Sequence, residues 1–124
     1  MNLKLVFRIY FGFGALMGAM MLFAPEAMME SYGMSYTNEI KLFIQFLLMA
    51  SLSFLIVTWM LPPWLGPDLS IAVPAYIVIA LMPVALNIFH VVTGAMPGSM
   101  SQIVESLIWV VFAGLFYFYS KKNA

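Results

Sequence analysis

Residues 40–61 read IKLFIQFLLMASLSFLIVTWML and residues 69–93 read LSIAVPAYIVIALMPVALNIFHVVT, with only PPWLGPD between them. Two more apolar stretches cover residues 3–24 and 101–120. At about 1.5 Å per helical residue, each stretch is long enough to cross the ~30 Å hydrocarbon core of a bilayer. The sequence therefore predicts an all-α integral membrane protein that folds as a four-helix transmembrane bundle.

The composition excludes several classes of protein. Hydrophobic residues make up 65% of the chain and charged residues 8%, whereas a soluble domain carries roughly 25% charged residues. The net charge is zero and no basic cluster is present, so nucleic-acid binding is not expected. The chain has no cysteine, which excludes disulfides and thiolate chemistry. The short connections leave no room for a second domain, so residues 1–124 form a single transmembrane domain.

The basic residues predict the topology. Lys4 and Arg8 lie at the start of the first span, Lys121 and Lys122 follow the fourth, and only Lys41 lies elsewhere. Four spans put both termini on the same side of the membrane. Because basic residues favour the cytoplasmic side, both termini are predicted to be cytoplasmic.

A short helix is predicted after the first span, over residues 25–33. Pro25 suits the first helical position, Glu26 suits the first turn, and Gly33 can adopt the positive φ that ends a helix. The segment faces outward in the predicted topology. We expect this helix to lie at the membrane interface or to cover the mouth of the bundle.

The third span contains a stripe of small and polar residues at 3-4-3-4 spacing: Ala80, Pro83, Asn87, His90 and Gly94. Such spacing places them on one helical face. Lipid disfavours exposed amide and imidazole groups, so Asn87 and His90 are expected to point into the bundle or a water-filled cavity. Pro83 is expected to bend the helix beside them. Two interpretations remain open, hydrogen bonding to neighbouring helices or a binding site.

Glu105 is the only acidic residue inside a span, at a depth similar to that of His90, and we expect the two side chains to meet. Lys41 and Gln45 open the second span on the same side. His90 and Glu105 are thus the candidate catalytic residues, and the candidate ligand-binding residues are Asn87, His90, Glu105, Gln45 and Lys41. The cluster either fixes the helix register or binds a polar head group, a quinone carbonyl, a proton or, least expected, a metal ion. No recognised ligand spacing predicts a metal site.

Gly14 and Gly18 form a Gly-x-x-x-Gly pattern, which predicts close helix packing. The partner helix belongs either to this chain or to a second copy. Together with Pro83 and Gly94, these glycines are the predicted helix-packing residues.

The first span and the following loop resemble the small four-helix bacterial membrane proteins of the DoxX-like type. The resemblance is carried by Arg8, Gly14, the run Leu22-Phe23-Ala24-Pro25-Glu26 and the run Tyr32-Gly33-Met34. It implies a location in the bacterial inner (plasma) membrane. Because some such proteins are small subunits of quinone-linked oxidoreductases, it also implies a link to quinone complexes. It assigns no catalytic residue.

Three functions remain open at this stage. The first is a non-catalytic accessory subunit that packs with partner helices and membrane lipid, either as a homo-oligomer or within a larger membrane complex. The second is an oligomeric transporter of small molecules or ions, or a binder of a lipophilic ligand. The third is an enzyme acting on a quinone or isoprenoid through His90 and Glu105, with Asn87 fixing the substrate. A quinone or a bound lipid is the ligand that these alternatives favour.

Overall fold

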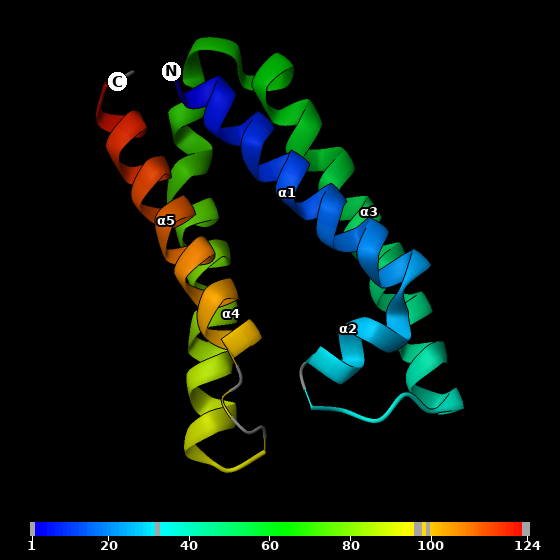
Figure 1. Ribbon diagram of the computed structural model, residues 1–124. Helices are drawn as coiled ribbons and strands as arrows, with labels where there is room; N and C mark the ends of the chain where they lie inside the picture. Colours follow the sequence, from blue (N-terminus) through cyan, green and yellow to red (C-terminus); the bar gives the residue numbers. More distant parts are fainter. Residues whose placement is uncertain (1, 32, 96–97, 99, 123–124) are drawn as a thin grey trace.

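The computed structural model in Figure 1 describes residues 2–31, 33–95, 98 and 100–122. Over these residues the chain is helical and contains no strand, which confirms the predicted all-α fold. The elements in chain order are α1 (Leu3–Phe23), α2 (Pro25–Ser31), α3 (Asn38–Leu65), the 3₁₀ helix η1 (Gly66–Ala72), α4 (Val73–Val92) and α5 (Met100–Lys122).

The four long helices form two antiparallel pairs, α1 with α3 and α4 with α5 (Figure 1). The pairs meet at the end of the molecule that holds η1, the start of α1 and the end of α5. From there they diverge, and α2 lies between them at the open end. The structure therefore differs from a uniformly packed bundle, because one end is closed and the other is splayed.

Local signals explain where the first helices begin and end. The Asn2 side chain accepts a hydrogen bond from the backbone N–H of Leu5 at 3.0 Å and so caps α1. Thr37 caps α3 in the same way, accepting from Ile40 at 3.3 Å. Pro25 opens α2, where a missing backbone N–H costs nothing. These caps explain why α1, α2 and α3 are separate helices although the chain is apolar over most of this region.

The predicted boundary between the second and third spans, residues 61 and 69, is wrong. α3 continues through Pro62 and Pro63 to Leu65, and α4 begins only at Val73 after η1. Gly66, with φ of +53°, ends α3. The helix tolerates two prolines because they lie in its last turns, where few further hydrogen bonds are lost. α1 and α5 agree with their predicted spans to within two residues.

Arg8 compensates for one of these prolines. Pro63 has no N–H to donate to the carbonyl oxygen of Trp59, four residues earlier. Nη1 of Arg8 donates to that oxygen at 2.9 Å instead. The guanidinium carbon also lies 3.5 Å from the centre of the Trp59 ring, a cation–π contact. A basic residue that the sequence placed at the membrane edge therefore links α1 to α3.

The predicted short helix is present as α2, although it ends at Ser31 rather than at residue 33. Met28 and Met29 are each only 7% exposed. The helix thus packs against the bundle, as expected of a segment that covers its mouth.

Aromatic side chains form the core at the closed end. The Phe7 ring of α1 lies 4.8 Å from Tyr76 of α4 and 4.9 Å from Phe116 of α5. Phe54 of α3 stacks on Tyr76 with the ring centres 5.7 Å apart. The hydroxyl groups of Tyr76 and Thr58 are hydrogen-bonded at 2.8 Å in a buried position. This cluster joins all four long helices, so it fixes the point at which the two pairs diverge.

Candidate functional site

The divergence of the two helix pairs leaves a cavity of about 330 Å³ beside the aromatic core. We call it the central cavity. Four elements contribute to its wall: α1 supplies Tyr10, Gly14, Met17, Gly18 and Met21, α2 supplies Met28, α3 supplies Leu47, Leu48, Ser51, Phe54 and Leu55, and α5 supplies Glu105 and Trp109. The wall is mostly apolar, with one carboxylate. This combination is typical of a site that binds a small molecule in a largely hydrophobic environment.

Glu105 is held on the cavity wall by its own helix. The indole N–H of Trp109, four residues later, donates a hydrogen bond to Oε1 of Glu105 at 3.2 Å. Residues four apart lie on the same helical face. The Trp109 ring is itself fixed by Phe13 and Tyr10, whose ring centres lie 5.1 Å and 5.6 Å from it. The carboxylate is therefore positioned by a side chain that is packed into the core.

Methionine side chains make up much of the remaining wall. Met17 and Met28 also line an adjoining recess of about 380 Å³, which opens between α1, α2 and α5 and again includes Glu105. Methionine is flexible and its sulfur is polarizable, so such a wall adapts to the shape of a bound molecule. The cavity and its recess therefore share the carboxylate of Glu105 as a lining group.

The wall between α1 and α3 is thin at Gly18. A Cβ atom at Gly14 would lie 2.8 Å from Cδ2 of Leu55, so the helices are in close contact there. A Cβ atom at Gly18 would meet nothing within 4 Å. The partner of the Gly-x-x-x-Gly face is thus α3 of the same chain, and only the first of the two glycines packs closely.

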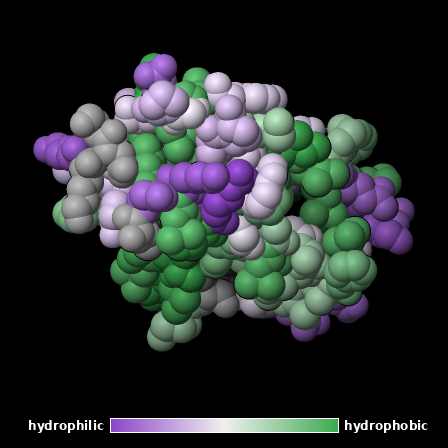
Figure 2. Space-filling model, turned by 90° about the horizontal axis from the view of Figure 1, so that it is seen from above, coloured by the Kyte–Doolittle hydropathy of each residue, from purple (hydrophilic) through white to green (hydrophobic). Residues whose placement is uncertain are grey.

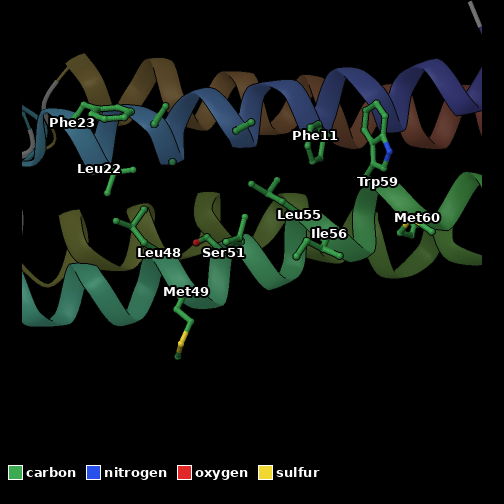
Figure 3. Close-up of a pocket in the computed structure, with 14 residues that line it drawn as sticks. Phe11, Leu22, Phe23, Leu48, Met49, Ser51, Leu55, Ile56, Trp59 and Met60 are labelled. Atoms are coloured by element: carbon green, nitrogen blue, oxygen red, sulfur yellow. The ribbon is translucent and has the colours of Figure 1, made fainter.

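On the outer side of this wall lies a second hollow, a groove of about 690 Å³ between α1 and α3. We call it the α1–α3 groove. Figure 3 shows Leu48, Ser51 and Leu55 pointing from α3 toward α1 along its floor. These three residues and Gly18 line both the groove and the central cavity. The two spaces are therefore separated, near Gly18, by few side-chain atoms.

The predicted contact between His90 and Glu105 stays a prediction, because the hydrogen bond that the structure shows for Glu105 comes from Trp109. Glu105 bonds to Trp109 and faces the central cavity. His90 lies in the last turn of α4 beside Phe89, and its buried Nδ1 has no hydrogen-bond partner. Asn87 bonds instead to α5, its amide nitrogen donating to Oγ of Ser106 at 3.0 Å. The structure thus brings Asn87 of α4 to α5 through a side-chain hydrogen bond.

The remaining predicted residues lie apart from the cavity. Lys41 and Gln45 are exposed in the first turns of α3. Pro83 lies half-buried inside α4. Gly94 follows the end of α4 with φ of +76°, and its N–H bonds to the carbonyl of Val91 at 3.2 Å. Its role is to end a helix, since that backbone conformation is unfavourable for other residues. None of these four residues lines the central cavity as described.

The geometry predicts which residues are energetically coupled to Glu105. In a double-mutant cycle, Glu105→Gln and Trp109→Phe should be coupled by about 0.5–3 kcal/mol, because the two side chains share a hydrogen bond. Glu105→Gln and His90→Ala should be additive to within about 0.3–0.5 kcal/mol. Unfolding of the purified protein in detergent measures both cycles. A larger coupling of Glu105 to His90 than to Trp109 would contradict this arrangement.

Two features of the site were missed by the sequence analysis. Trp109 was not linked to Glu105, although the spacing of four residues on one helix is a signal for such a bond. Met17 and Met28 were not singled out either, because no pattern in the sequence distinguishes them from other apolar residues. Met17 and Met28 line the central cavity because their sides of α1 and α2 are turned toward it, and only the tertiary structure decides that orientation.

Comparisons of the chain with protein-family models, with curated proteins and with solved structures find no match. Within the described residues, three helical segments are long and apolar enough to cross a membrane: Leu3–Phe23, Asn38–Val92 and Gln102–Lys121.

Proposed function

We propose that the chain is a multi-pass membrane protein in which α1, α3, α4 and α5 each cross the bilayer once. The segment Asn38–Val92 has 55 residues, about twice what one crossing requires. It reverses direction at η1 (Figure 1), so each of its halves supplies one crossing. Large apolar side chains cover its outer surface, with Phe43 70% and Phe46 67% exposed. Lipid is the solvent that such a surface favours.

The distribution of charge supports cytoplasmic termini. Lys4, Arg8 and Lys121 lie at the closed end of the molecule, where Figure 2 shows hydrophilic side chains among apolar ones. The open end carries the three carboxylates of Glu26, Glu30 and Glu39 and the basic side chain of Lys41, so it is more acidic than the closed end. The positive-inside rule then places the closed end in the cytoplasm. The resemblance to DoxX-like proteins favours a bacterial inner membrane.

The function that the geometry supports best is the binding of a lipophilic molecule between the two helix pairs. The central cavity carries this proposal, because it combines an apolar, adaptable wall with one fixed carboxylate. A quinone, an isoprenoid or a lipid has the required solubility in the membrane.

Filling the cavity tests this function. Met17→Trp puts a larger side chain into the space, whereas Val78→Trp adds the same side chain to a position on α4 that is 60% exposed. Each variant is purified in mild detergent, and bound molecules are identified by native mass spectrometry and organic extraction. The wild type and Val78→Trp should retain a small lipophilic molecule that Met17→Trp loses. Equal amounts in all three, or none in the wild type, would reject the proposal.

A second candidate function is that of an accessory subunit, and the α1–α3 groove favours it. Ala15, Gly18 and Ala19 line the groove, and small residues let a further transmembrane helix approach closely. We take a second copy of this chain as the partner. The chain has no cysteine, so Ala19→Cys introduces a single thiol. Oxidative crosslinking in membranes should give a dimer with Ala19→Cys but not with Val78→Cys. Equal dimer from both variants, or none, would reject this arrangement.

A further inference from the structure

The chemical class of the ligand follows from the groups that line the central cavity. We propose that the cavity binds a hydrophobic organic cation, a compound with a substituted ammonium or phosphonium group, and that Glu105 is its counter-ion. This inference rests on the proposed function and adds the charge of the ligand to it. Three observations carry it: the carboxylate, the aromatic rings beside it and the thin wall at Gly18.

The carboxylate supplies the charge. Among the described residues that line the central cavity and its recess, the charged side chain is that of Glu105. The indole N–H of Trp109 donates a hydrogen bond to this carboxylate, and such a bond favours the anionic form. Surrounded by apolar groups, this charge acts over a longer range than it would in water. The cavity therefore attracts cations and repels anions.

Aromatic rings supply the surface that a bulky cation requires. Tyr10, Phe54 and Trp109 all line the cavity, and the Tyr10 ring centre lies 5.6 Å from that of Trp109 and 6.4 Å from that of Phe54. The faces of such rings attract cations, and substituted ammonium groups are recognised in this way. The rings and the carboxylate line the same cavity, so the proposal places one bound cation against both.

The same wall is unsuited to a metal ion. Calcium and magnesium need six or more oxygen ligands, or a shell of retained water. Within the described residues, no group of three or more His, Asp or Glu side chains is placed to hold a metal. The methionines and aromatic rings cannot replace the hydration shell of a hard cation. An organic cation gives up less hydration when it is buried, because its charge is spread over apolar substituents.

The position of Gly18 provides a route from the bilayer. A lipophilic cation gathers in the membrane, and the α1–α3 groove faces lipid in the proposed topology. Gly18 lines both this groove and the cavity, and it presents no side chain between them. The ligand would therefore pass between α1 and α3 at this level, past the side chains of Leu48, Ser51 and Leu55 that line both spaces, and would not enter from water.

A matched pair of probes tests the charge. Tetraphenylphosphonium and tetraphenylborate have nearly the same shape and opposite charge. Binding of each is measured by equilibrium dialysis on the purified full chain in detergent. Tetraphenylphosphonium should bind saturably to the wild type and to Glu39→Gln, which changes a carboxylate on the exposed first turn of α3. Glu105→Gln should weaken its binding at least about tenfold, the low end for close charge pairs removed from water. Tetraphenylborate should not bind saturably.

The outcomes separate this inference from the proposed function. Equal affinity of the wild type for both probes overturns the inference, and this result does not depend on whether Glu105→Gln folds. Unchanged binding of tetraphenylphosphonium by Glu105→Gln also overturns it. In either case the proposed function stands if the purified Met17→Trp variant still fails to retain the small lipophilic molecule that the wild type binds. If phosphonium binding is lost in Glu105→Gln but unaffected by Met17→Trp, the cavity is not the site and the inference fails. If no ligand responds to Met17→Trp, the proposed function fails too.

The route is tested on the same helix. Gly18→Phe should slow the association of tetraphenylphosphonium with protein in lipid vesicles at least about tenfold, because the new ring fills the gap. Gly12→Phe is the control, since a side chain there also meets nothing within 4 Å but lies outside the central cavity. Equal slowing in both variants, or in neither, would show that the ligand does not pass at Gly18.

Discussion

Phe116→Ala is expected to lower the free energy of unfolding by about 3–5 kcal/mol, the range for removing a large side chain from a core. The Phe116 side chain is fully buried, at 0% exposed. Its ring centre lies 4.9 Å from that of Phe7, 5.4 Å from Tyr10 and 5.5 Å from Tyr76. Truncation leaves a hole where α1, α4 and α5 meet. We expect the free energy of unfolding to fall in a bilayer as well, because helices there associate largely through close packing.

Phe118→Ala is the matched control. Phe118 lies two residues further along α5 and is 55% exposed, so its truncation leaves no internal hole. Unfolding of both variants by a graded series of sodium dodecyl sulfate in mixed micelles gives the two free energies. Phe118→Ala should cost less than about 1 kcal/mol, as is usual away from packed or strained sites. Similar losses in the two variants would mean that the aromatic cluster does not hold the helix pairs together.

Arg8→Met is expected to cost about 1–2 kcal/mol, because it removes both the hydrogen bond to the carbonyl of Trp59 and the cation–π contact with its ring. Methionine keeps much of the length of arginine but can neither donate a hydrogen bond nor form the cation–π contact. The expected loss depends on Pro63, which creates the need for an outside donor. In a Pro63→Ala background the restored N–H can bond to Trp59, so Arg8→Met should cost less there.

Comparing Arg8→Met in the wild-type and Pro63→Ala proteins separates the role of Arg8 as a hydrogen-bond donor from a general need for positive charge. The measurement is again the free energy of unfolding in detergent, for the wild type, both single variants and the double variant. Arg8→Lys gives a further control, since lysine keeps the charge but lacks the planar group that stacks on Trp59. An equal cost of Arg8→Met with and without Pro63 would show that Arg8 does not replace the missing donor.

Several elements could be predicted from the sequence because their causes are local. The apolar runs gave the long helices, since backbone groups in a hydrocarbon environment must bond within their own segment. Pro25 and Glu26 correctly predicted the start of α2. The turn between α3 and α4 was predicted too early, at residues 62–68. A proline pair normally ends a helix, and the donor that satisfies Trp59 comes from Arg8, 51 residues away.

The sequence by itself determined that Glu105 lies within a long apolar helix, which the structure confirms as α5, because the position of a residue along a helix follows from its place in the chain. Only the tertiary structure decided which neighbours it meets. Successive residues of a helix point about 100° apart, and packing sets the rotation of α5, so Ser106 faces Asn87 of α4 while Glu105 faces the cavity between the helix pairs. The position of a side chain along the helix axis follows from the sequence. The direction in which that side chain points depends on how the helix packs against the other helices.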